Sequence, residues 1–63
     1  MLKISMKAAR VNANISQKEM AKLMGKSQST VMFWEQGKKV PRVDELRQYC
    51  DICGCDPSDI SFA

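Results

Sequence analysis

The sequence has no histidine, and only seven of its 63 residues are Asp or Glu. Histidine is the usual general base near neutral pH, so its absence removes the commonest acid–base group. There is also no glycine-rich phosphate loop and no nucleophile beside a base, and the few carboxylates fall largely at helix starts. We therefore predict that the protein is not an enzyme, and we expect no cofactor and no small-molecule ligand.

Long apolar runs are missing as well. The longest ones are far too short to cross a bilayer, and no charged, apolar and small-residue leader opens the sequence. With 63 residues the chain can build one small core, so we expect one domain spanning 1–63. These features predict a cytoplasmic protein with no membrane partner.

Cysteine is present three times, in the pattern Cys50-x-x-Cys53-x-Cys55. Three thiols at this spacing could bind a metal ion or act as a redox sensor. However, no histidine and no fourth cysteine is available to complete a tetrahedral site. Free cysteine behaves as a small apolar residue in reducing compartments. We predict core thiols and no metal site, with metal binding or redox sensing by these thiols as the alternative.

The net charge is only +3, but the charges are unevenly distributed. Residues 1–42 hold nine Lys and Arg against two Glu, a net +7, and residues 43–63 hold one Arg against five Asp and Glu, a net −4. A basic first part and an acidic last part are typical of a protein that places one face on a polyanion. The alternative is an uneven solvated surface without a partner.

Residues 15–37 read as two short helices joined by a tight turn. Ser16 followed by Glu19 is a capping-box pattern and predicts a helix over 17–24, which Gly25 ends. At 100° per residue one face of this helix is apolar. We expect that face to be buried; it holds Met20, Ala21, Leu23 and Met24.

The second of these helices is predicted over 28–36, with Ser27 as its cap and Gly37 after its end. Thr30, Val31 and Trp34 point to one side, and Val31 and Trp34 are apolar enough to hold the helix on a core. The other side mixes amide, hydroxyl and apolar groups, which suits base edges that include thymine methyls. That side holds Gln28, Ser29, Met32, Phe33 and Gln36.

Three further helices are predicted, over about 4–13, 43–53 and 57–61. Met6, Ala9 and Ala13 form the apolar stripe of the first one. The apolar face of the second contains Val43, Leu46, Cys50 and Cys53, and Arg42 leaves its start without a side-chain cap. Asp56 and Pro57 mark the start of the last one.

The pattern resembles the phage repressor/Cro-type (XRE-like) helix-turn-helix family from about Ile4 to Ile60. The shared residues are Ile15-Ser16-Gln17, Met20-Ala21, Met24-Gly25, Ser27, Ser29-Thr30-Val31, Trp34-Glu35, Gly37-Lys38 and Pro41. The resemblance implies an all-α, compact bundle of about five short helices, a lambda-repressor-like DNA-binding domain. It also implies an inward ion pair between Arg10 and Glu35, while Asn14 stands where the family commonly has glycine.

The resemblance further implies sequence-specific binding of double-stranded DNA by a transcriptional regulator of the Cro or repressor type, with helix 28–36 in the major groove. The base-reading residues are then Gln28, Ser29, Met32 and Phe33. Phosphate contacts fall to Ser16, Gln17, Lys26, Ser27, Gln36, Lys38, Lys39 and Arg42.

One helix of this length reads few base pairs, so we expect a homodimer on DNA. The dimer contact is predicted at the acidic end, at Gly54, Cys55 and Phe62. The alternative function keeps the fold but uses it as a protein–protein interaction module, in an adaptor or an antitoxin. Met32 and Phe33 motivate that alternative, because apolar residues on an exposed face often contact a protein.

Overall fold

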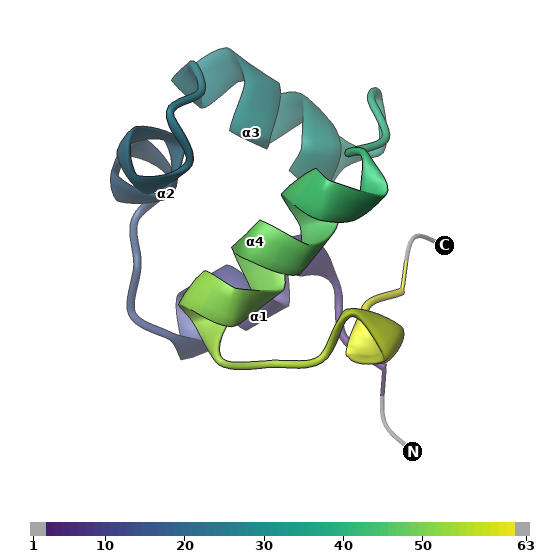
Figure 1. Ribbon diagram of the computed structural model, residues 1–63. Coiled ribbons are helices and arrows are strands. Elements are labelled where there is room, and N and C mark those ends of the chain that lie inside the picture. Colours follow the sequence, from purple (N-terminus) through teal and green to yellow (C-terminus); the bar gives the residue numbers. More distant parts are fainter. Residues whose placement is uncertain (1–2, 62–63) are drawn as a thin grey trace.

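The chain folds into four α-helices followed by one turn of 3-10 helix, and the computed structural model describes residues 3–61 (Figure 1). The elements are α1 (Met6–Asn12), α2 (Gln17–Met24), α3 (Gln28–Gln36), α4 (Val43–Cys53) and η1 (Pro57–Asp59). The all-α prediction is confirmed, and the expected count of about five short helices is close to what is found. The bounds of α2, α3 and α4 agree with the predicted ranges.

The predicted helix 4–13 was wrong at both ends. The Ser5 hydroxyl accepts a hydrogen bond from the Ala8 N–H at 3.0 Å, so Ser5 is the cap and α1 begins after it. Ile4 is extended and forms a parallel bridge with Ile60. Because Ile4 is extended in this bridge, it lies outside the helix, and at the other end Ala13 is the C-cap residue that follows α1.

The predicted helix 57–61 was also wrong in extent and type. Only Pro57–Asp59 is helical, as a single 3-10 turn, and the Asp56 carboxylate caps it by accepting the Ser58 N–H at 2.9 Å. Ile60 has extended backbone angles and is buried beside Ile4. The Ile4 N–H donates to the Asp59 carbonyl at 2.8 Å, which joins the two ends of the described chain.

Local capping fixes the turn between α2 and α3. The Ser16 hydroxyl accepts the Glu19 N–H at 3.0 Å, and the Glu19 carboxylate accepts the Ser16 N–H at 3.4 Å. Gly25 ends α2 with a positive φ of 66°, a conformation that costs glycine little. The Ser27 hydroxyl then accepts the Thr30 N–H at 3.2 Å and starts α3.

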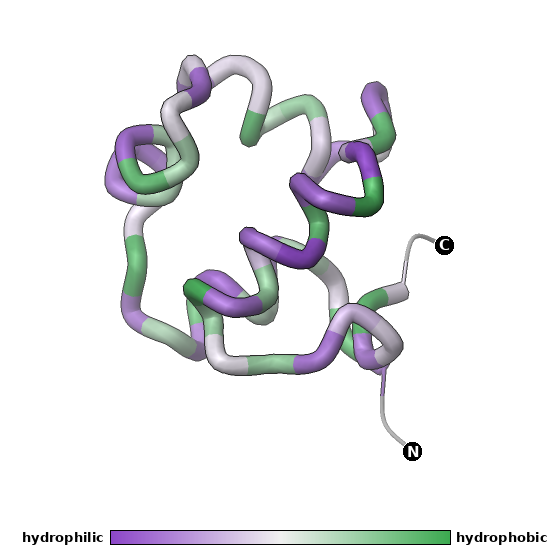
Figure 2. Tube along the Cα trace, in the orientation of Figure 1, coloured by the Kyte–Doolittle hydropathy of each residue, from purple (hydrophilic) through white to green (hydrophobic). Residues whose placement is uncertain are grey.

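The helices surround one core. In Figure 1, α2 and α3 lie at an angle to each other across the short turn, and α4 crosses in front of α1. Figure 2 shows apolar and polar segments alternating along the chain. Each of the four α-helices contributes buried residues to the core. The buried apolar residues are Met6, Ala9, Met20, Ala21, Met24, Val31, Trp34, Tyr49, Cys50 and Ile60.

Two residues predicted on buried faces are exposed. Leu23 is 57% exposed, because the buried face of α2 centres on Met20 and Met24 and places Leu23 on its flank. Val43 is 77% exposed, because it occupies the first turn of α4, beyond the end of the core. The largest fully buried side chain is instead Tyr49, which the sequence did not single out. Within residues 3–61, none of the helices combines the length and apolarity that a bilayer crossing requires.

Candidate nucleic-acid interface

Helix α3 is anchored on one side and open on the other. Val31 is fully buried and Trp34 is 5% exposed, as predicted. On the opposite side the predicted reading residues lie at the surface to different degrees. Gln28, Ser29 and Gln36 are exposed, and Met32 and Phe33 are half-buried. The polar residues on this side of α3 are therefore exposed, whereas the apolar residues between them are partly covered.

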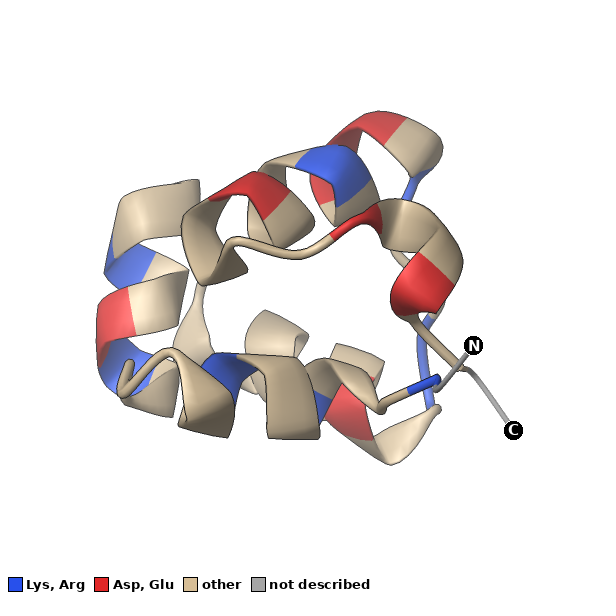
Figure 3. Ribbon diagram, turned by 90° about the horizontal axis from the view of Figure 1, so that it is seen from below, with Lys and Arg blue, Asp and Glu red and all other residues tan. Residues whose placement is uncertain are grey.

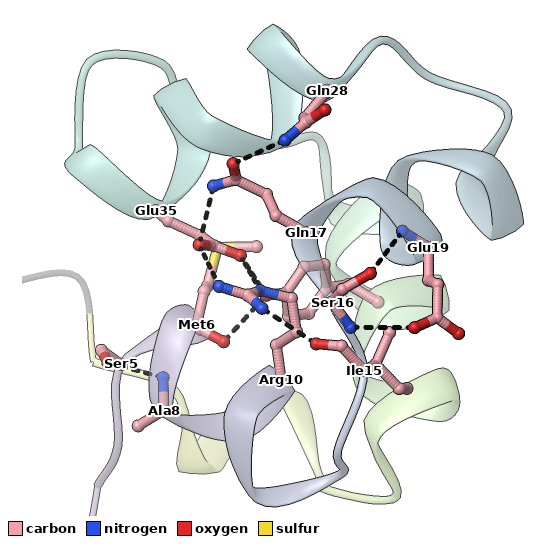
Figure 4. Close-up of polar contacts among 11 residues, drawn as sticks. Ser5, Met6, Ala8, Arg10, Ile15, Ser16, Gln17, Glu19, Gln28 and Glu35 are labelled. Atoms are coloured by element: carbon pink, nitrogen blue, oxygen red, sulfur yellow. Dashed lines mark hydrogen bonds and ion pairs between the residues drawn. The ribbon is translucent and has the colours of Figure 1, made fainter.

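A chain of hydrogen bonds connects the first turn of α3 to the interior (Figure 4). The Gln28 side-chain amide donates to the Gln17 carbonyl oxygen at 3.4 Å, and the Gln17 amide donates to Glu35 Oε1 at 3.2 Å. Among the described residues, no group donates to the Gln28 side-chain carbonyl oxygen. Gln17 thus holds the Gln28 amide through its nitrogen, and the amide oxygen stays available to an outside partner.

Glu35 is the inner end of this chain and pairs with Arg10, as the resemblance implied. Arg10 Nε donates to Glu35 Oε2 at 2.7 Å and Nη2 donates to Oε1 at 3.1 Å, so the pair is bidentate. The Arg10 Nη1 group donates to the Ile15 carbonyl at 2.9 Å. The Tyr49 hydroxyl lies 2.8 Å from both Glu35 Oε2 and the Met6 carbonyl, and these two acceptors share its single hydrogen.

The electrostatics of this cluster keep it charged. Burial alone would raise the pKa of the Glu35 carboxyl, but hydrogen bonds from Arg10 and Tyr49 outweigh burial and hold that pKa below its usual range. The hydrogen bond to Glu35 likewise raises the pKa of Arg10. Burial and the neighbouring Glu35 raise the pKa of Tyr49, which stays a neutral donor. The pair ties α1 to the end of α3 at any pH near neutral.

Basic residues follow directly after α3. Gly37 has a positive φ of 77° and turns the chain back, so that Lys38 and Lys39 come close to the last turn of the helix. Both lysines and the following Val40 are exposed, whereas Pro41 is buried. The arrangement places two cations beside the open side of α3.

This set of features matches a known family. A helix-turn-helix family model matches residues 6–60, which is nearly the whole chain. The chain belongs to the XRE-type helix-turn-helix family. Members of that family bind DNA, and the matched range contains all four α-helices. Searches among curated proteins and among solved structures gave no match.

Four of the other residues that were predicted to contact phosphates have roles inside the fold of this helix-turn-helix domain. Ser16 and Ser27 cap α2 and α3 with their hydroxyls. Lys26 Nζ lies 2.9 Å from Glu45 Oε2, and Glu45 Oε1 accepts the Arg42 N–H at 2.8 Å. The Arg42 N–H and the Lys26 ammonium lower the pKa of Glu45. Glu45 thereby brings Lys26 and Arg42 to the same end of α4.

The three cysteines of the helix-turn-helix domain lie at the C-terminal end of α4. Cys50 is buried, and Cys53 and Cys55 are half-buried against the core. Burial raises the pKa of the Cys50 thiol and raises that of Cys53 to about 11, which disfavours the reactive thiolate. Within the described part of the chain, no cluster of His, Cys, Asp or Glu is arranged to hold a metal ion.

The region predicted for the dimer contact is only partly described. Gly54 is exposed at the end of α4, and Cys55 is half-buried beside it. Phe62 lies outside the described residues. Figure 3 shows acidic segments along α4 and the turn that follows it. Two of these acidic residues, Asp44 and Glu45, lie in the first turn of α4, where Glu45 pairs with Lys26.

Proposed function

We propose that this chain is a sequence-specific regulator of transcription that binds double-stranded DNA with α3 in the major groove. The observation that carries the proposal is the exposed first turn of α3, where Gln28 is held by Gln17 and, through it, by the buried Glu35. A glutamine held in this way can offer a donor and an acceptor to one base edge. Adenine presents the complementary acceptor and donor in the major groove. Ser29 and Met32 lie beside Gln28 on the same side.

Phosphate contacts are proposed on both sides of that reading surface. Lys38 and Lys39 follow α3, and Lys26 and Arg42 meet at the start of α4. Such contacts fix the register of a protein on DNA without reading its sequence. Gln36 is exposed at the end of α3, and Ser16, Gln17 and Ser27 lie at the starts of α2 and α3. Hydroxyl, amide and backbone N–H groups at helix starts suit phosphate oxygens.

The proposed functional unit is a homodimer on a near-palindromic site. Two copies of α3 would enter successive major grooves about 34 Å apart. Gly54, Cys55 and Phe62 are the proposed contact, because Gly54 and Cys55 follow the end of α4 that is opposite to the end where Lys26 and Arg42 meet. The role as a Cro-like or repressor-like switch places the protein in the cytoplasm of a bacterial or phage-infected cell.

Selection of bound sites from a random DNA pool, followed by binding measurements on the best site, tests this function. Gln28→Ala should lose about 1–3 kcal/mol of binding free energy on that site and relax the preference at one base pair. Gln48→Ala is the matched control, because Gln48 is an exposed glutamine on α4. Equal losses for Gln28→Ala on specific and random duplexes would remove Gln28 from base reading.

The alternative function, a protein-interaction module, rests on the apolar groups of the surface. Met32 and Phe33 are half-buried on the open side of α3, and Val40 is 80% exposed just beyond it. A mobility-shift series over salt concentration separates the two functions. DNA binding through phosphates weakens steeply with salt. A chain that shifts no duplex even at low salt would favour the protein module.

A further inference from the structure

Phe33 has two cations over its ring. The Nζ atoms of Lys38 and Lys39 lie 5.8 and 5.6 Å from the ring centroid. Both distances are within the range of about 6 Å at which an ammonium is attracted to an aromatic ring. Phe33 is half-buried, so part of the residue remains at the surface beside these two cations.

The backbone converges on the same residue. The Phe33 carbonyl accepts the Lys38 N–H at 2.9 Å and the Lys39 N–H at 3.3 Å. The left-handed turn at Gly37 makes this geometry possible. Each lysine is therefore tied to Phe33 twice, through its main chain and through its ammonium. Two long side chains that would otherwise move independently are directed to one place.

Within the described residues, no carboxylate forms an ion pair with either ammonium. Among residues 3–61 the ion pairs are Arg10–Glu35 and Lys26–Glu45, and neither includes Lys38 or Lys39. The negative end of the α3 dipole offsets part of their mutual repulsion. An anion placed between or beside the ammoniums would offset the rest. If α3 lies in the major groove, the anions that these two lysines would meet are the phosphates of the DNA backbone.

We infer that Phe33 is a positioning residue that holds Lys38 and Lys39 for the DNA phosphates, in place of the base-reading role that its position on α3 suggested. This inference rests on the proposed DNA binding. A base-reading Phe33 would contact a thymine methyl and change sequence preference. If Phe33 is instead a positioning residue, its replacement changes the number of phosphates that the lysines contact and leaves the sequence preference unaltered.

The salt dependence of binding distinguishes these roles. Binding of the full chain to a 20-bp duplex of random sequence would be measured by fluorescence anisotropy over a series of NaCl concentrations. Each phosphate contact contributes about 0.9 to the slope of log K against log salt. Phe33→Leu, which keeps an apolar side chain but removes the ring, should reduce the slope by about one to two. Phe33→Tyr keeps the ring and should restore the wild-type slope.

A double-variant comparison and a measurement without DNA complete the test. In a Lys38→Gln, Lys39→Gln background, Phe33→Leu should produce no further change in slope. In the free wild-type protein, proton NMR should show ring-current shifts of the lysine ε-methylene signals, a readout that does not require Phe33→Leu to fold. Absence of those shifts would overturn the inference. So would an unchanged slope with altered preference at one base pair. A wild-type chain that binds no duplex would instead refute the proposed function itself.

Discussion

Removal of the Glu35 carboxylate should cost most of the stability of this domain. Glu35→Ala leaves Arg10, Tyr49 and Gln17 without their common acceptor. The Arg10 side chain is only 10% exposed, so a nearly buried cation would lose its counter-ion. Loss of one partner from a buried ion pair costs about 3–5 kcal/mol. A domain of 63 residues has a total stability of roughly 3–9 kcal/mol.

Urea denaturation followed by the fluorescence of Trp34, the single tryptophan, measures this loss directly. Asp44→Ala on the exposed start of α4 is the control and should stay within about 1 kcal/mol of wild type. The double variant Arg10→Met, Glu35→Leu should recover part of the loss, since apolar residues of similar size need no counter-ion. A cost below about 1 kcal/mol for Glu35→Ala would refute the argument that burial makes this pair indispensable.

The same carboxylate predicts the direction of the acid response. The pKa of Glu35 is lower in the folded state than its ordinary value of about 4.3 in an unfolded chain. The unfolded state therefore binds more protons, and stability falls as pH drops from about 4.3 through the folded pKa. Glu35→Gln should make the urea midpoint less dependent on pH in that window. An unchanged pH dependence would show that other carboxylates dominate it.

Three further predictions concern other parts of the molecule. Trp34→Ala should cost roughly 3–5 kcal/mol and leave the chain largely unfolded by far-UV circular dichroism, because the indole is nearly buried; a folded variant would show that α3 is rotated differently. Lys39→Ala should weaken binding to all duplexes about equally and reduce the salt slope by about one, whereas a change in base preference would contradict a phosphate role. Phe62→Ser should abolish cooperative binding to two half-sites while preserving each single contact, as footprinting would show; a single half-site bound at full affinity by one chain would count against the dimer.

The parts of the fold that sequence predicts well depend on local interactions. The limits of α2 and α3 follow from Ser16, Gly25 and Ser27, whose caps involve residues at most five positions away. The start of α1 also has a local cap, because the Ser5 hydroxyl accepts the Ala8 N–H, and the prediction of a helix from Ile4 missed it. The extended conformation of Ile4, in contrast, depends on its bridge to Ile60, 56 positions along the chain. No local pattern around Ile4 records that pairing.

The exposure of Leu23 and Val43 shows a second limit. A helical wheel identifies an apolar arc, but the neighbouring helices decide how much of the arc they cover. Tyr49 is the reverse case, since its place three residues after Leu46 on α4 was a usable signal. The polar hydroxyl of tyrosine, however, is equally compatible with a position at the surface. Only the placement of Glu35 and the Met6 carbonyl shows where that hydroxyl finds its partners.

The candidate site joins these two kinds of information. Which residues lie on the open side of α3 follows from the wheel, so Gln28 and Ser29 could be selected from sequence. How Gln28 is held depends on three helices at once, because Gln17 comes from α2 and the Arg10 that neutralises Glu35 comes from α1. If Gln28 reads a base, the geometry of that contact depends on a charge pair in the interior. Substitutions of Arg10 that preserve folding should then alter the base preference at the position that Gln28 reads, although Arg10 itself is buried and makes no contact with DNA.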